Sequence, residues 1–311
     1  MFGVAELILG YLQRNVGMRT DGLDASGSIH SRLRATTFGG LFYLNDGADG
    51  DRTFATNTVL ESGVYRYNNM TVNTGVTITP TQSFLAFFVK GTLNLTGTAT
   101  ISASGKGAAG GLGGYCNTAN SGTAGNPGVA GFGGAGSGAS GGGRSATYMS
   151  GAGGDTDYPG GTAAAAANGN TGVGLPKGGR LWSDLQYLMA CKGGGGGGGA
   201  SVTSSTSASW VRGGAGGAGG GAILIVANNI TGTGMLKSEG VAGSIGTQSD
   251  TNYGVASGGG GGGGGYIVVF GTLPSTITTS VVGGTGGPPA TTTYYSGAAG
   301  GNGCFVNFPL T

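Results

Sequence analysis

"CKGGGGGGGASVTSSTSASWVRGGAGGAGGGAILIV" (residues 191–226) contains two glycine-rich tracts and, directly after them, a run of five aliphatic residues. Ordering a glycine costs roughly 0.5–1 kcal/mol more than ordering an alanine, because glycine has more backbone freedom to lose. The aliphatic run, in contrast, has to be buried. A chain with this combination therefore needs a structural role for its glycines.

Packed extended helices provide such a role. In a threefold helix of the polyproline II type, which rises about 3.1 Å per residue, the backbone forms no internal hydrogen bonds. Its N–H and C=O groups can therefore bond to neighbouring tracts, and only glycine lets the backbones come close enough. Collagen is excluded because the chain has eight prolines and no sustained G-X-Y register. A flexible linker is the alternative, but linkers do not alternate with apolar runs such as 222–227 and 266–271.

The composition excludes several classes of protein. Of 311 residues, 77 are glycine and only 8% are charged, with a net charge of +2, whereas disordered chains are rich in charge. The basic residues do not cluster, which argues against nucleic acid as a partner. No apolar run approaches the roughly 20 residues of a membrane span, and the N-terminus does not resemble a secretion signal. The three cysteines, far apart and in no metal-binding pattern, are expected to be free thiols: Cys116, Cys191 and Cys304.

Three zones follow one another along the chain. Residues 1–45 have helical patterning, residues 46–104 are rich in β-strand residues, and residues 105–311 are glycine-rich. In the first zone, one short helix with an apolar face is expected near the N-terminus, and a second is expected between Ser26 and Arg34. The N-terminal helix is too short to be stable alone, so we expect its apolar face to attach the chain to neighbours or to further copies. The residues on that face are Val4, Leu7, Ile8, Tyr11 and Leu12.

The zone 46–104 has the period of two that is typical of strands, as in "GVYRYNNMTVNTGVTITP" (63–80). Gly63, Gly75, Gly91 and Gly97 are predicted to supply turns. Short strands at this spacing suit a parallel β-solenoid and a β-sandwich equally well. The sequence therefore predicts a mainly β protein and leaves both architectures open.

An internal repeat links the second and third zones. The segment 84–111 recurs in looser form at 220–244 and more weakly at 264–287. Each copy contains an apolar strand, a turn, a second short strand and a glycine-rich tract. The segment 303–310, "GCFVNFPL", is predicted to be a last strand that closes the set.

The sequence gives little support for catalysis or for a cofactor. With His30 as the single histidine, a catalytic triad or a histidine metal site has too few ligands. Nothing matches GxxxxGK[ST], so nucleotide binding is rejected. Asp155 and Asp157 form the one close acidic pair of the glycine-rich zone, and a solvated loop or a weak calcium site fits them better than hydrolysis. We therefore predict a binding protein that is not an enzyme.

The segments between the glycine tracts are rich in aromatic and small polar residues, the composition of adaptable binding loops. Their exposed aromatic residues are the candidates for binding a receptor glycan or protein: Tyr148, Tyr158, Trp210, Tyr253, Tyr294 and Tyr295.

Glycine-rich tracts that bracket short non-repetitive segments resemble the receptor-binding tail-fibre tips and adhesins of tailed bacteriophages, in which polyglycine II helices pack together. The phrase "NVGMRTDGLDASGSIHSRLR" (15–34) is similar to the start of virion proteins of phages that infect Gram-positive bacteria. The resemblance implies a virion tail protein, assembled in the host cytoplasm and extracellular after release. It would contact other tail or baseplate proteins through its N-terminal region and bind the host surface through its loops. The apolar N-terminal helix and the low charge favour a trimer. The alternatives are a self-assembling subunit of an extracellular filament or capsid decoration and, third, an ice-binding protein.

Overall fold

A computed structural model describes the chain over these residues: 46–116, 121–123, 125, 126, 128, 193–199, 201–203, 210–249, 254–290 and 296–309. The described part is mainly β, as predicted, and no helix occurs within it. Both predicted N-terminal helices, with Val4, Leu7, Ile8, Tyr11 and Leu12, lie outside these residues.

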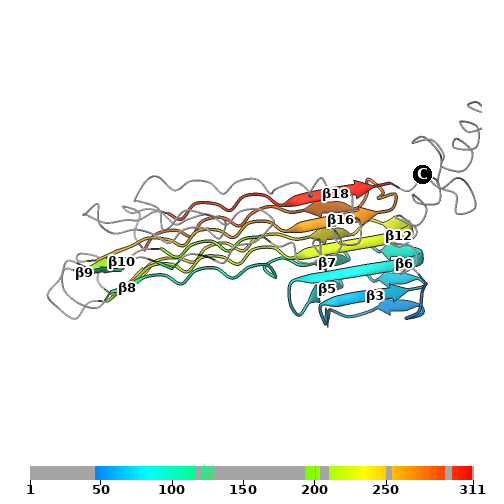
Figure 1. Cartoon of the computed structure of the whole chain (residues 1–311), viewed down its shortest axis with the longest axis horizontal. Coiled ribbons are helices and arrows are strands. Elements are labelled where there is room, and N and C mark those ends of the chain that lie inside the picture. Colours follow the sequence, from blue (N-terminus) through cyan, green and yellow to red (C-terminus); the bar gives the residue numbers. More distant parts are fainter. Residues whose placement is uncertain are drawn as a thin grey trace, which may run out of the picture.

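Two parallel sheets form the part of the molecule that we call the strand body (Figure 1). The larger sheet has the order β1-β4-β6-β12-β16-β18, with β3 also paired to β6, and the smaller has the order β17-β13-β7-β5-β2. The strands of the larger sheet are β1 (Arg52–Phe54), β3 (Gly63–Tyr67), β4 (Met70–Val72), β6 (Phe84–Leu95), β12 (Ala222–Gly232), β16 (Tyr266–Phe270) and β18 (Cys304–Phe308). Those of the smaller sheet are β2 (Thr58–Leu60), β5 (Thr77–Pro80), β7 (Thr100–Ser102), β13 (Met235–Lys237) and β17 (Thr278–Ser280).

Equivalent residues of the internal repeats pair with one another in the sheets. Phe84 pairs with Ala222, which pairs with Tyr266, so the first residues of β6, β12 and β16 stack in one row. Cys304 of the predicted last strand β18 extends that row by pairing with Tyr266. The second strands of the repeats, β7, β13 and β17, align in the smaller sheet in the same way. The three sequence copies are therefore consecutive layers of one stack.

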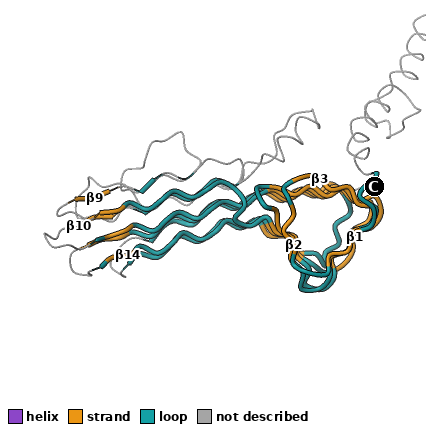
Figure 2. Tube along the Cα trace, turned by 90° about the horizontal axis from the view of Figure 1, so that it is seen from below, coloured by secondary structure: helices purple, strands orange, loops and turns teal. Residues whose placement is uncertain are grey.

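The core lies between the two sheets. Alternate residues of β6, β12 and β16 point inward toward Ile78, Ile101 and Leu236 of the smaller sheet, and all belong to one buried apolar cluster. Burying each such side chain contributes about 1.5–3 kcal/mol. In Figure 2 the stacked layers are seen end on, and the chain closes a ring around this core. The inward residues of the three larger strands are Leu85, Phe87, Val89, Ile223, Ile225, Ile267 and Val269.

Two of the four predicted turn glycines have another role. Gly75 and Gly97 do form turns, with φ of 77° and 56°, values that favour glycine. Gly63 instead begins β3, and Gly91 lies inside β6. The register between β6 and β12 shifts next to Gly91, and a Cβ there would overlap the side chain of Asn69. Gly91 is therefore needed for close approach at a strand irregularity.

Long glycine-rich tracts lead out of the strand body, return to it and pack side by side (Figures 1 and 2). We call them together the glycine bundle. Tracts that pair through their backbones run parallel in some pairs and antiparallel in others. The described tracts are 105–114, 193–199, 213–221, 238–246, 257–265, 281–290 and 296–303.

Hydrogen bonds between the tracts recur at every third residue. Tract 213–221 donates to tract 257–265 from Gly214, Gly217 and Gly220, at N···O distances of 2.8, 2.9 and 2.8 Å. Tract 193–199 donates to tract 213–221 with the same step of three. This is the periodicity of a threefold extended helix.

Tract 257–265 lies at the centre of the bundle and bonds to five other described tracts. Its Gly259, Gly260 and Gly261 donate to three different neighbours, through the carbonyls of Ser244, Gly197 and Ala298. Every residue of this tract is buried. A Cβ on most of its glycines would overlap a neighbouring carbonyl, for example that of Ala218 at Gly262. The glycines are thus required by backbone packing.

Side chains larger than those of alanine and serine occupy the outer positions of the described tracts. On tract 105–114, Ala109 and Leu112 are exposed, whereas Ala108 and Gly111 beside them are buried. On tract 281–290, exposed residues recur at the same step of three. The threefold periodicity therefore determines which positions tolerate a large side chain.

Candidate functional site

The ends of the glycine tracts remote from the strand body carry short antiparallel strands (Figures 1 and 2). We call this region the tip. It contains two three-stranded sheets, with the orders β15-β10-β9 and β14-β11-β8. The strands are β8 (Tyr115–Cys116), β9 (Ser121–Thr123), β10 (Ser201–Thr203), β11 (Val211–Arg212), β14 (Thr247–Gln248) and β15 (Gly254–Ala256). The glycine tracts thus hold these strands far from the core.

The sheet β14-β11-β8 has one exposed face. Val211 pairs with Cys116 and Gln248 and is fully buried. Arg212, the next residue, pairs with Tyr115 and Thr247, and all three are exposed. Because successive side chains of a strand point to opposite faces, Tyr115, Arg212 and Thr247 share the solvent side of the sheet.

Trp210 joins this face from the position two residues before Arg212. Its amide donates to Ser249 Oγ at 2.8 Å, and its carbonyl accepts from Ser249 N at 2.9 Å. Ser249 Oγ also donates to that carbonyl at 3.2 Å. The backbone of Trp210 is therefore held in place, while the residue is 42% exposed. We call Tyr115, Trp210, Arg212 and Thr247 the tip platform.

The tip platform carries one positive charge. The ion pairs within the described ranges are Arg66 with Asp46 at 3.1 Å and Lys237 with Glu239 at 3.6 Å. Neither involves Arg212. Arg212 is exposed, is paired with Tyr115 and follows Trp210 by two residues.

The opposite side of the same sheet holds an unsatisfied amide. Both polar atoms of the Gln248 side chain are buried and have no hydrogen-bond partner within the described part of the chain. Leaving a buried polar group unpaired costs about 1–3 kcal/mol. The tip therefore has an unpaired polar group in the same row as the buried Val211.

The strand body has a polar cluster of another kind. Asp51 Oδ1 accepts from Asn68 Nδ2 at 2.9 Å and from the amide N and Nδ2 of Asn69 at 3.0 and 3.1 Å. These bonds, first that from Asn68, lower the pKa of Asp51 below its usual value. Asn69 also accepts from the amide of Thr92. This cluster fixes the bend between β3 and β4 through one oxygen of the Asp51 carboxylate, Oδ1.

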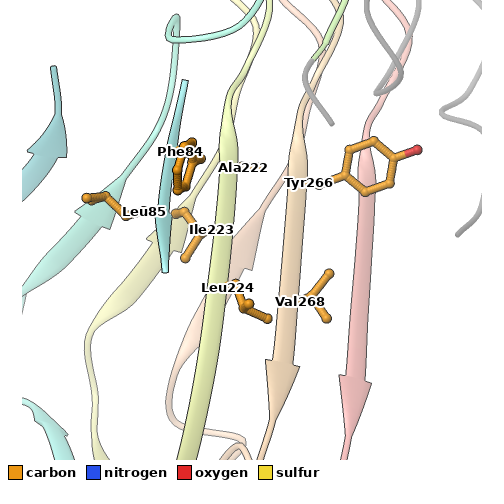
Figure 3. A pocket seen from close by; sticks show the side chains of 7 residues that line it. All are labelled: Phe84, Leu85, Ala222, Ile223, Leu224, Tyr266 and Val268. Atoms are coloured by element: carbon orange, nitrogen blue, oxygen red, sulfur yellow. The ribbon is translucent and has the colours of Figure 1, made fainter. Parts of the chain in front are cut away.

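An apolar pocket lies at the start of the large-sheet strands (Figure 3). Its lining contains only one polar side chain, that of Tyr266. Elsewhere in the strand body, burial raises the pKa of Tyr65 and Tyr67. The lining residues are Phe84, Leu85, Ala222, Ile223, Leu224, Tyr266 and Val268.

Within the described ranges, no three His, Cys, Asp or Glu side chains come together in a way that could hold a metal ion. The same part of the chain contains no helix that is long and apolar enough to cross a membrane.

Of the site residues predicted from the sequence, Trp210 is in the described part of the chain and lies at the tip. The other candidates lie outside the described residues: Tyr148, Tyr158, Tyr253, Tyr294, Tyr295, Asp155 and Asp157. Tyr115 and Arg212 were missed by sequence reasoning. Arg212 could have been found from the alternation of Trp210, Val211 and Arg212, which places it on the same face as Trp210. Tyr115, in contrast, is brought beside Arg212 only by strand pairing.

Comparisons of the chain with protein-family models, curated proteins and solved structures found no match.

Proposed function

We propose that this chain is a receptor-binding protein of a phage tail fibre or tail tip, which contacts the host surface through its tip. The observation that carries the proposal is the tip platform, an exposed face with two aromatic residues and one cation at the far end of the glycine bundle. Aromatic residues with small polar neighbours are typical of recognition surfaces. A binding surface on a long rigid support can reach a receptor that a compact domain would not.

The architecture supports this function in two further ways. We propose that the strand body is a parallel β-solenoid, since corresponding strands of successive repeats stack in parallel and the layers close a ring. The tracts of the glycine bundle are then polyglycine II helices that extend from successive solenoid layers. The layers that begin with β12 and β16 each send out their own pair of tracts, 238–246 with 257–265 and 281–290 with 296–303, so the segments at the far ends can vary while the support is unchanged.

The N-terminal region has the role of attachment in this proposal. Residues 1–45 attach the chain to other tail or baseplate proteins, and the apolar positions from Val4 to Leu12 pack against further copies in a trimer. The chain acts by binding and needs no cofactor. It is assembled in the host cytoplasm and works outside the cell as part of the virion.

Cell binding tests the proposed function. The purified, fluorescently labelled chain should cosediment with cells of at least one strain in a panel of Gram-positive bacteria. Trp210→Ala should weaken this binding at least tenfold, and Tyr294→Ala with Tyr295→Ala should weaken it without unfolding the chain. Val282→Ala is the control, because Val282 is an exposed apolar residue on the glycine bundle. Equal binding of the Trp210 and Val282 variants would contradict the proposal.

One observation favours the structural alternative. β18 ends the larger sheet, and its Phe305 and Phe308 are 37% and 40% exposed. An edge strand with exposed aromatic side chains can pair with another chain. In a filament subunit or capsid decoration, the purified chain would polymerise through this edge, and Phe305→Lys would prevent polymerisation while Trp210→Ala would not.

A further inference from the structure

The tip platform combines ring faces and a cation at close range. Tyr115 and Trp210 are 48% and 42% exposed, and Arg212 is paired with Tyr115 and two residues from Trp210. Paired residues in an antiparallel sheet have Cβ atoms about 4.5–5.5 Å apart, and residues i and i+2 of a strand lie about 6.5–7 Å apart. The three side chains therefore share an area of about the size of one or two sugar rings.

We infer that the tip platform binds an acidic saccharide, a sugar ring that carries a carboxylate or a phosphate group. This inference rests on the proposed function and names the class of its receptor. The flat aromatic faces supply apolar contact area for the C–H face of a sugar ring at low entropic cost. The planar guanidinium of Arg212 matches the geometry of a carboxylate or phosphate and bonds it bidentately. The hydroxyl of Thr247 donates to and accepts from sugar hydroxyls.

The charge of the site decides between acidic and neutral saccharides. Only 8% of the chain is charged, so an exposed arginine on the same sheet face as Tyr115 is not part of a general charged surface. No carboxylate in the described part of the chain forms an ion pair with Arg212. An anionic group on the ligand supplies the missing partner.

The composition of the face decides between a saccharide and other anionic polymers. A nucleic-acid site needs several cations along the phosphate backbone, whereas the platform has one. Protein interfaces centre on apolar anchors in desolvated pockets. The platform itself has no such pocket: its apolar groups are the two exposed aromatic side chains, and its other two members, Arg212 and Thr247, are polar.

Tryptophan fluorescence gives a direct test, because the chain has only two tryptophans, Trp182 and Trp210. In a Trp182→Phe background, the emission of Trp210 is titrated with polygalacturonate, with its carboxyl-reduced neutral form, with a sugar-phosphate polymer and with polyglutamate. Saturable change with at least one acidic saccharide, at least tenfold tighter than with the neutral form, is expected. The preference should fall as NaCl is raised. The carboxylate and phosphate polymers identify which acidic group is preferred.

Variants locate the site. Arg212→Gln should reduce the preference for the acidic polymer at least tenfold, whereas Lys90→Gln, which removes an exposed cation from β6 in the strand body, should leave it unchanged. Trp210→Ala, measured by calorimetry, should lose binding. Thermal unfolding checks that each variant is folded. Equal affinity for acidic and neutral polymers, an unchanged Arg212→Gln variant, or equally tight binding of polyglutamate would overturn the inference.

Cell binding by the same variants separates this inference from the proposed function. If Arg212→Gln binds bacterial cells as the parent chain does, the receptor-binding function stands and the acidic saccharide is wrong. If the chain binds the acidic polymer and no cell of the panel, the ligand class stands and the virion function is wrong. Binding to neither overturns both.

Discussion

The strand body and the glycine bundle both have a buried interior, but the first is filled by side chains and the second by backbone. In the strand body, buried side chains such as Phe87 and Ile225 exclude water between two sheets. In the glycine bundle, tract 257–265 is equally buried although eight of its nine residues have no side chain. Its backbone groups bond to neighbouring backbones instead. The comparison shows that a buried interior needs satisfied hydrogen bonds and close packing. Large side chains are only one way to achieve close packing.

The largest expected effect is a side chain in the centre of the glycine bundle. In Gly262→Val, the new Cβ would overlap the carbonyl of Ala218, and no flexible group can move aside. We expect the free energy of unfolding to fall by more than about 4 kcal/mol, an exceptional value for one substitution. Ala299→Val, at an exposed position of tract 296–303, should change it by less than about 0.5 kcal/mol. Chemical denaturation measures both, and similar values for the two would mean that the tracts are not packed.

Removal of a core ring from the strand body comes next. Phe87 is fully buried, and Phe87→Ala should cost about 3–5 kcal/mol through lost burial and the cavity left behind. Val64→Ala, at a position 42% exposed, is the matched control and should have little effect. Calorimetry of Phe87→Ala and Gly262→Val tests whether the strand body and the glycine bundle unfold together. If the strand body and the glycine bundle unfold as one unit, both substitutions shift the same transition; two separate transitions would show two independent units.

A smaller effect is expected at the satisfied polar cluster of the strand body. The hydrogen bonds from Asn68 and Asn69 lower the pKa of Asp51 in the folded chain, so its ionised form contributes stability above the unfolded value of 3.8. That contribution is lost as the pH falls through the lower folded pKa. Asp51→Asn should therefore lower the melting temperature slightly at neutral pH, and the difference should vanish in acid. A difference that persists unchanged at the lowest pH would show that charge is not involved.

The smallest effect is expected at the unsatisfied amide of the tip. Gln248→Met replaces two buried, unpaired polar atoms by an apolar group of similar length. Such a replacement should leave the free energy of unfolding unchanged or raise it by about 1 kcal/mol. Gln82→Met, at an exposed position of the strand body, is the control and should not be stabilising. A clear loss of stability in Gln248→Met would mean that the amide has a partner in solution.

Much of the fold was predictable from local patterns. The repeat at 84–111, 220–244 and 264–287 predicted which strands are equivalent, and the register of Phe84, Ala222 and Tyr266 agrees with it. The sequence did not distinguish a solenoid from a sandwich, because both bury alternate residues of short strands. Parallel pairing of Phe87 with Ile225, far apart in the sequence, is a property of the assembled chain.

The candidate site was predictable only in part. Trp210 was found because an aromatic residue in a polar segment between glycine tracts favours an exposed loop. Tyr115 follows a glycine tract and has no aromatic or charged neighbour that would mark it. Its role as a member of the tip platform depends on pairing with Arg212, 97 positions later in the numbering.

By itself, the sequence determined that this protein is mainly β and that its glycines must have a packing role, because long runs without side chains next to buried aliphatic segments leave no other source of order. It also determined the repeated unit. The tertiary structure alone decided which tracts lie together and which side chains share the tip platform. These depend on hydrogen bonds between backbones distant in sequence, and a backbone amide is the same at every glycine, so no residue type can encode its partner.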